Sequence, residues 1–248
     1  MSAISALVQS NAVHMMTDSL LYVRGKVVQT DFPKCLPIRG MRAAIASTGP
    51  ASFAYLLAEM LATSCTTFDQ VAAKDREWFH GAFDWYIENE RAGASEYATV
   101  VLIGWLEAED RPAAFAIELS NGGEKAEWVK RNNAHTDPSN VAHNLVELPI
   151  LANPIPPVED LRAAGWRLGV DRDARDAEVD LLHMLEIQRR RRATDGRYYV
   201  GGHAVLTTVT REGVAQRAVH HWPEDRVGKP IRPKPMDWKG WRTRRVAA

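Results

Sequence analysis

Three side chains near the start of the chain have the types and the spacing that amide-bond chemistry requires. Ser2 follows the initiator methionine, Asp18 lies sixteen positions further on, and Lys34 lies sixteen positions after Asp18. Removal of Met1 would leave Ser2 with a hydroxyl nucleophile and a free α-amine on the same residue. That amine has a reference pKa of about 7.7–8.0, which suits a general base near neutral pH. These residues therefore predict acyl transfer through the Ser2 hydroxyl, with the α-amine as its base.

Lys34 and Asp18 are expected to contribute charge to this chemistry. An ammonium group beside Ser2 lowers the pKa of the hydroxyl or of the amine through its field. A carboxylate paired with that ammonium keeps it protonated and fixes its position. We therefore expect Lys34 to be an electrostatic helper and Asp18 to be its partner, and mutation of any of the three residues should reduce turnover strongly.

Two hairpins are expected to bring these side chains together. They pair residues 3–8 with 12–17, and residues 35–38 with 42–46. The first hairpin turns the start of the chain back beside Asp18, and the second has Lys34 at its entry. The turn Ser47-Thr48-Gly49-Pro50 then opens an apolar helical pattern. Backbone N–H groups at a helix N-terminus stabilise negative charge, so this turn predicts a binding site for the tetrahedral oxyanion.

The rest of the chain alternates helices with strand pairs. Helices are expected over residues 67–93, shortly after Pro156-Pro157, and over residues 174–192; strands are expected over residues 99–105, 113–119, 198–210 and 214–221; residues 120–153 are expected to be a loop. The 174–192 helix should bury Val179, Leu182 and Leu185 and turn Glu186 and its arginines outward.

This element order favours two sheets packed face to face and covered by helices on both sides. The predicted fold class is α+β, a four-layer αββα sandwich. Residues 1–248 are expected to form a single domain with a proline-rich basic tail from about residue 223.

The composition excludes several classes of protein. Thirty-one basic and thirty-one acidic residues give a net charge of zero, so no global field attracts nucleic acid. Cys35 and Cys65 cannot form a disulfide framework, and neither a signal peptide nor an apolar run long enough for a membrane span is present. The eight histidines lack metal-ligand spacing. We therefore expect a cytoplasmic protein with no membrane association, no cofactor and no metal.

The Ser2/Asp18/Lys34 spacing, the turn ahead of the amphipathic helix and the element order resemble the proteasome β-subunit branch of the N-terminal nucleophile (Ntn) hydrolases. That branch includes the bacterial peptidase that partners an AAA+ unfoldase. The resemblance implies a peptide or protein substrate, a homo-oligomer such as a ring, and an AAA+ unfoldase as a further partner. It also implies that Thr48 or Gly49 donates the oxyanion hydrogen bond. Gly201-Gly202 matches the family's glycine pair, where close backbone approach near the site requires small residues.

The chain departs from the family pattern at three places. The family uses threonine far more often than serine as its nucleophile. An acidic residue and a serine normally precede the glycine pair and orient the terminal amine, but Val200 stands at the serine position and Asp195 is out of register. The family's serine turn before the third helix has no match in residues 151–154. These departures favour an alternative, an assembly or scaffold protein with a degenerate site; a small-molecule amidase is a third interpretation.

Two basic segments allow more than one role. Arg189–Arg192 end a helix, where cations complement the helix dipole, so we expect a solvated face, with an intersubunit contact as the alternative. The tail carries Trp238 and Trp241 among basic residues. We expect it to pack over its own or a neighbouring subunit rather than to stack on nucleic acid.

Overall fold

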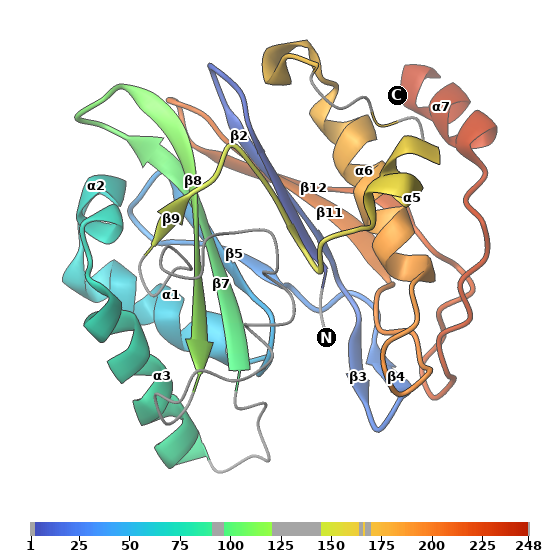
Figure 1. Cartoon of the computed structure of the whole chain (residues 1–248), viewed down its shortest axis with the longest axis horizontal. Helices are drawn as coiled ribbons and strands as arrows, with labels where there is room; N and C mark the ends of the chain where they lie inside the picture. Colours follow the sequence, from blue (N-terminus) through green and yellow to red (C-terminus); the bar gives the residue numbers. More distant parts are fainter. Residues whose placement is uncertain (1–2, 91–96, 121–144, 164–165, 167–169, 248) are drawn as a thin grey trace.

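Two antiparallel sheets form the centre of the molecule (Figure 1). The computed structural model describes residues 3–90, 97–120, 145–163, 166 and 170–247. Within these ranges, the first sheet contains, in order, β10 (Ile150–Asn153), β1 (Ile4–Val8), β2 (Val13–Asp18), β11 (His203–Val209) and β12 (Val214–His221). The second sheet contains β5 (Cys35–Pro37), β6 (Ala43–Ser47), β7 (Tyr97–Leu106), β8 (Arg111–Ser120) and β9 (Val146–Glu147). A separate ribbon pairs β3 (Leu21–Val23) with β4 (Lys26–Gln29).

Helices cover the outer face of each sheet (Figure 1). The second sheet is covered by α1 (Phe53–Ser64), α2 (Phe68–Ala72) and α3 (Arg76–Glu90). The first sheet is covered by α5 (Val158–Ala163) and α6 (Ala177–Arg190), and α7 (Trp238–Ala247) lies alongside α6. A 3₁₀ turn at Arg172–Ala174 comes just before α6 in the chain. The layers therefore stack in the order helices, sheet, sheet, helices.

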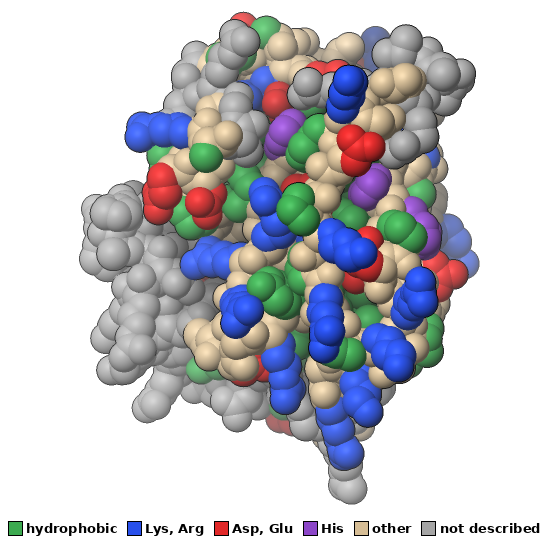
Figure 2. All heavy atoms as spheres, turned by 90° about the vertical axis from the view of Figure 1, so that its right-hand side faces the viewer, with side chains coloured by type: hydrophobic (Ala, Val, Ile, Leu, Met, Phe, Trp, Pro, Cys, Tyr) green, Lys and Arg blue, Asp and Glu red, His purple; other side chains and the backbone are tan. Residues whose placement is uncertain are grey.

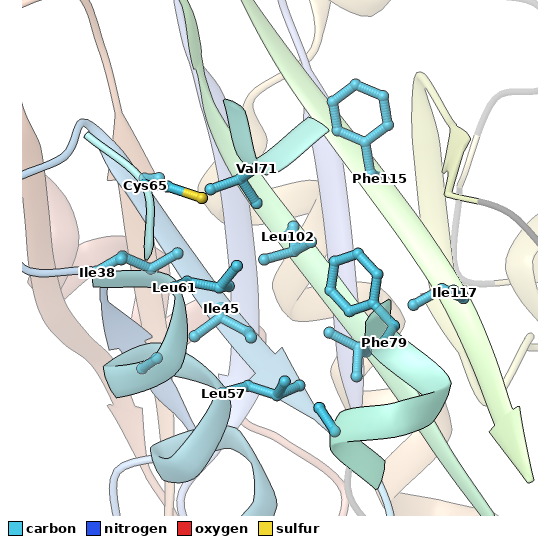
Figure 3. Packing of buried hydrophobic residues seen from close by; sticks show 14 of the residues in the cluster. Ile38, Ile45, Leu57, Leu61, Cys65, Val71, Phe79, Leu102, Phe115 and Ile117 are labelled. Atoms are coloured by element: carbon cyan, nitrogen blue, oxygen red, sulfur yellow. The ribbon is translucent and has the colours of Figure 1, made fainter. Parts of the chain in front are cut away.

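Three apolar clusters hold these layers together. One lies between α1–α3 and the second sheet, and Figure 3 shows Leu57 and Phe79 from the helices in the same layer as Ile45 and Leu102 from the sheet. A second lies between α6 and the first sheet. The third draws side chains from both sheets, including Met15 from β2 and Val101 from β7. This shared cluster packs the two sheets against each other, as two inner faces of a sandwich do.

The predicted hairpins are confirmed. The strands β1 and β2 pair with Ile4 opposite Thr17, and β5 and β6 pair with Cys35 opposite Ala46. The β7–β8 and β11–β12 hairpins also form, although β11 begins at His203 rather than at the predicted residue 198. Continuous apolar runs joined by short turn segments therefore predict these pairs well.

The single helix predicted over residues 67–93 is wrong, because two helices occupy its described part. Thr67 accepts the backbone N–H of Gln70 and starts α2, which ends at Ala72. Asp75 accepts the backbone N–H of Trp78 at 2.9 Å and starts α3. Each side chain satisfies an N–H that a new helix would leave unpaired. The predicted end at Gly93 lies outside the described residues.

The loop predicted over residues 120–153 is also wrong where the structure describes it. The strand β10 pairs with β1 along four residues, and β9 pairs with β8. Both are short strands at sheet edges, and their pairing comes from tertiary contacts that leave little periodicity in the sequence. Residues 121–144 lie outside the described ranges.

His14 on β2 predicts a pH dependence of folding. Its ring Nδ1 lies 2.9 Å from the Thr208 hydroxyl across the β2–β11 pair. Burial, assisted by Arg217 and opposed by Asp176, lowers the pKa of His14 from 6.5 to about 4. The folded state thus binds fewer protons than the unfolded state between these values, so stability is full above pH 6.5 and falls as the pH drops toward 4, at up to ~1.4 kcal/mol per pH unit. Urea unfolding at pH 7.5, 6 and 5 measures this loss, and His14→Gln should flatten the slope; an unchanged slope contradicts the assignment to His14.

Candidate active site

A buried ion pair joins the two sheets at one end of the molecule. The Lys34 Nζ donates to Asp18 Oδ2 at 2.8 Å. Asp18 ends β2 in the first sheet, and Lys34 comes directly before β5 in the second. The Asp18 side chain is fully buried, and that of Lys34 is 7% exposed. The structure therefore brings together these two predicted site residues as a buried charged pair.

Backbone N–H groups surround the other lone pairs of Asp18. Its Oδ1 accepts the N–H of Ala3 at 3.1 Å, and its Oδ2 accepts the N–H of Gly201 at 3.1 Å as well as the Lys34 ammonium. The N–H of Leu20 lies 3.4 Å from Oδ2. A carboxylate that accepts this many donors is held in one orientation.

The charge state of Lys34 is set by two opposing effects. Burial lowers the pKa of the Lys34 ammonium below its ordinary value of 10.5, and the charge and hydrogen bond of Asp18 offset only part of this lowering. A buried lysine without a partner loses its proton easily, whereas a carboxylate 2.8 Å away favours the ammonium. The charge of Lys34 thus depends on Asp18.

Ser2 lies outside the described residues. Its chain neighbour Ala3 is buried and donates its N–H to Asp18. The nitrogen of that N–H is the atom to which the Ser2 carbonyl carbon is covalently bonded. The structure therefore ties the residue that follows Ser2 directly to the Asp18–Lys34 pair.

The predicted oxyanion turn lies at the same end of the second sheet. Because Cys35 pairs with Ala46, the antiparallel register sets Lys34 opposite Ser47, the last residue of β6. Thr48 follows and makes two hydrogen bonds to Thr99: its N–H donates to the carbonyl at 2.9 Å, and its hydroxyl accepts the N–H at 3.1 Å. The Thr48 N–H is thus already engaged.

Gly49 is the remaining donor of the two that were predicted. Within the described part of the chain, its N–H makes no hydrogen bond. Its φ is +93°, and a Cβ built on it would lie 2.4 Å from the Tyr97 carbonyl oxygen, so glycine is required here for two reasons.

The prediction that residues 47–50 open the helix is wrong. The helix α1 begins at Phe53 with Ser52 as N-cap, so the turn precedes the helix and receives less of its dipole.

Gly201 and Gly202 contact the Asp18 region through their backbone. The Gly201 N–H donates to Asp18, and the Gly201 carbonyl accepts the N–H of Ser19 at 3.2 Å. Gly202 has a φ of +78°, and a Cβ on it would lie 2.2 Å from the Thr30 carbonyl oxygen. Ser19 holds the same turn, since its hydroxyl donates to the Thr30 carbonyl and accepts the N–H of His203. The sequence predicted the glycine pair but not the part played by Ser19.

The expectation that Glu186 and the arginines of α6 face outward is wrong for two residues. Glu186 is 2% exposed and Arg189 is 0% exposed. Glu186 accepts the indole N–H of Trp222, and Arg189 forms an ion pair with Asp225. A signal for this was present, because Glu186 and Arg189 continue the helical spacing of Leu182 and lie on the stripe that it begins. The surrounding run of arginines concealed it.

The residues that orient a terminal amine in the family have no counterpart among the described contacts of this region. Val200 is buried among the apolar side chains under α6, and its carbonyl accepts from Arg189. Asp195 is exposed and accepts hydrogen bonds from Tyr199 and from the N–H of Arg197. Among the described residues, neither side chain makes a hydrogen bond to Asp18 or Lys34, so this departure from the family pattern persists in the structure.

The basic segments divide between surface and interior. Figure 2 shows that Lys and Arg predominate over Asp and Glu in the lower half of the face along which the tail runs. Arg190, Arg191 and Arg192 are exposed, as expected of the end of a helix. The predicted packing of the tail over its own subunit is confirmed: Trp241 is 4% exposed and donates to the Val219 carbonyl at 3.0 Å, and Trp238 stacks on His183 at 3.7 Å. The helix α7 that presents them was not predicted.

Metal ligands and membrane spans were also sought in the described ranges. No three His, Cys, Asp or Glu side chains there come together in a way that could hold a metal ion. None of the helices described has both the length and the apolar character needed to cross a bilayer.

Cys35 is buried as a free thiol, and its burial raises the pKa of the thiol to about 12, so it is not a nucleophile near neutral pH.

Comparison with known proteins adds no family to these observations. No family model matches the sequence, and no curated protein matches it either. The chemistry of the site therefore has to be inferred from its residues and contacts.

Proposed function

We propose that this chain is a proteasome-like Ntn hydrolase, a peptidase that cleaves amide bonds by acyl transfer through Ser2 after removal of Met1. The proposal includes the αββα sandwich of that family, which the stacking of helices, two sheets and helices supports. It also includes the cytoplasmic location and the homo-oligomeric assembly that the resemblance implies, with an AAA+ unfoldase as a further partner.

One observation supports the proposal most directly. The buried Asp18 carboxylate holds the Lys34 ammonium on one oxygen and the Ala3 N–H on the other. A structural ion pair needs no link to the second peptide bond of the chain, whereas an N-terminal nucleophile needs its neighbours to be fixed beside the charge. A buried ion pair is itself weak evidence for stability, because desolvation offsets most of its attraction.

The residues have separate roles in the proposed reaction. The free α-amine of Ser2 accepts the hydroxyl proton as the oxygen attacks the substrate carbonyl carbon, and the Lys34 field favours the charged oxygen. The carbonyl oxygen becomes an oxyanion, for which the Gly49 N–H is the donor. The protonated amine then gives its proton to the leaving amine as the C–N bond breaks. An acyl ester on Ser2 remains.

Hydrolysis of this ester completes the cycle. The same α-amine accepts a proton from water, and the resulting hydroxide attacks the ester carbonyl. The second tetrahedral intermediate collapses, the C–O bond to Ser2 breaks, and the serine oxygen takes back a proton. A peptide acid leaves, and the free amine is restored for the next substrate.

The alternative is a scaffold protein that keeps this fold with a degenerate site. It is favoured by Val200, which packs under α6, and by Asp195, which is exposed and engaged with Tyr199. Without groups that orient the terminal amine, a serine there can remain unreactive even when Asp18 and Lys34 are in place.

A hydroxyl-reactive electrophile separates the two functions. Purified protein lacking Met1 is treated with a β-lactone, and its intact mass is recorded before and after. We expect one adduct, mapped to the first peptide and absent from Ser2→Ala, together with cleavage of fluorogenic peptides. Thr48→Ser is a matched control that should form the adduct as the wild type does, because it keeps both the N–H and the hydroxyl that bond to Thr99. Mature protein that forms no adduct and cleaves no peptide contradicts the peptidase; activity on compact amides alone indicates an amidase.

A further inference from the structure

A second buried ion pair lies behind the glycine turn of the candidate site. Arg189 on α6 donates from Nη1 to Asp225 Oδ2 at 2.7 Å and from Nη2 to Asp225 Oδ1 at 3.0 Å. Both side chains are 0% exposed. This two-bond geometry fixes the guanidinium and the carboxylate in one plane, which a single contact does not do. The pair is therefore a rigid buried element.

The pair bonds to the same glycine turn that Asp18 contacts. Asp225 Oδ2 also accepts the N–H of Gly202 at 2.8 Å, and Arg189 Nη1 also donates to the Val200 carbonyl at 2.7 Å. A Cβ built on Gly201 would lie 2.2 Å from Asp225 Oδ2 and 2.4 Å from Arg189 Nη1. The pair therefore packs directly on the backbone of this turn.

Two buried carboxylates thus hold consecutive N–H groups of one turn. Asp18 accepts from Gly201, and Asp225 accepts from Gly202. Asp18 in turn holds Lys34. A displacement of the turn on the Asp225 side would change the donors that Asp18 receives, and with them the position of the Lys34 ammonium.

A second buried carboxylate lies beside the pair and does not itself bond to the turn. Glu186, one turn earlier on α6, is also buried and accepts the Trp222 indole N–H at 2.6 Å. The Arg189 guanidinium lies 4.6 Å from the centre of the same indole ring. Glu224 adds a second carboxylate to Arg189, at 2.9 Å from Nη2. The Arg189 and Asp225 side chains bond directly to Val200 and Gly202, whereas Glu186 reaches the turn only through Trp222, whose backbone N–H donates to the Gly202 carbonyl at 3.0 Å.

We infer that Arg189 and Asp225 are positioning residues for the candidate site, which hold the Gly201–Gly202 turn so that Asp18 keeps Lys34 in place. This inference rests on the proposed function of Ser2. In the family, an acidic residue and a serine ahead of the glycine pair order the site. This chain has Val200 at the serine position and an exposed, out-of-register Asp195, so we assign that ordering to Arg189 and Asp225. A buried pair at this point serves geometry, since its net stabilisation is small.

The test compares two variants that each perturb buried charge on α6. Arg189→Met/Asp225→Asn removes both charges of the pair together and leaves only the partly exposed Glu224 without its contact to Arg189, whereas Glu186→Gln removes a buried carboxylate that does not itself bond to the turn. Each is measured below its own unfolding temperature. We expect the double variant to lower the rate constant of β-lactone acylation by at least about tenfold, the factor set by a small shift of a reacting group, and to change its pH profile; Glu186→Gln should stay within about twofold.

The outcomes distinguish this inference from the proposed function. If the wild-type protein forms no adduct, the proposed function fails and the inference fails with it. If the wild-type protein reacts, equal rates and equal pH profiles for the two variants overturn the inference alone. Should the double variant fail to fold, Arg189→Lys serves instead: loss of hydrogen-exchange protection at the Gly201 and Gly202 amides, with slower acylation, supports the positioning role, and unchanged values overturn it.

Discussion

Replacing Asp18 by asparagine is expected to destabilise the fold by about 3–5 kcal/mol at neutral pH, because it leaves the buried Lys34 ammonium without its counter-ion. The carboxylate that is lost accepts hydrogen bonds from Lys34, Ala3 and Gly201. An amide oxygen can replace only part of this set, and it carries no charge. β-Lactone acylation should fall by on the order of 10²-fold, as happens when a preorganised electrostatic group is removed.

The stability of Asp18→Asn should also depend on pH, because the variant leaves Lys34 buried without its carboxylate. Burial lowers the pKa of Lys34, and the carboxylate opposes that shift. Without the carboxylate, the folded state holds its lysine proton less tightly than the unfolded state does. Stability of Asp18→Asn should therefore rise as the pH increases toward the unfolded-state value of about 10.4, where the lysine is released from its charge. Urea unfolding at pH 7 and pH 9.5 measures this recovery.

A double variant provides the control for Asp18. Asp18→Asn/Lys34→Met removes the unpaired charge and should regain part of the lost stability, because an apolar side chain tolerates burial better than an unpaired ammonium. It should not regain acylation. A double variant as unstable as the single one, or a single variant as stable as the wild type, contradicts the role assigned to this pair.

The sequence predicted the two hairpins that carry Asp18 and Lys34, because hairpins leave local signals in the chain. Hairpins around Asp18 and Lys34 follow from apolar runs joined by turn residues, which are signals between neighbours in the chain. Their pairing across two sheets does not follow from local rules. The spacing of Asp18 and Lys34 suggested that the two residues meet, and the structure shows the contact at 2.8 Å. The strand β10, which the sequence did not predict, is held by long-range pairing with β1.

The residues that surround the site were harder to predict for a different reason. Arg189 belongs to a run of four arginines, and such runs are solvated at the ends of most helices. Its burial requires a carboxylate that lies 36 positions further along the chain and an indole ring beside it. Helical spacing placed Arg189 on the apolar stripe, but only the tertiary contact with Asp225 makes that position tolerable for a charge.

Gly202→Ala is expected to cost about 2–5 kcal/mol, the sum of a left-handed backbone and a steric conflict. The residue has a φ of +78°, and the added Cβ would lie 2.2 Å from the Thr30 carbonyl oxygen and 2.9 Å from the Ser19 hydroxyl. The carbonyl is backbone and cannot rotate away, so the turn must move. Because Gly201 and Gly202 donate to Asp18 and Asp225, this movement should also slow acylation.

Gly40→Ala separates the two contributions at Gly202. Gly40 has a φ of +80°, nearly the same as Gly202, but nothing lies within 4 Å of its Cβ position. It should therefore cost only about 1–2 kcal/mol, the backbone contribution alone, and leave acylation unchanged. Urea unfolding of the two variants under one condition gives the difference, which measures how tightly Thr30 and Ser19 close on the turn. Equal costs, or equal acylation rates, would mean that the turn yields freely and does not hold Asp18 in place.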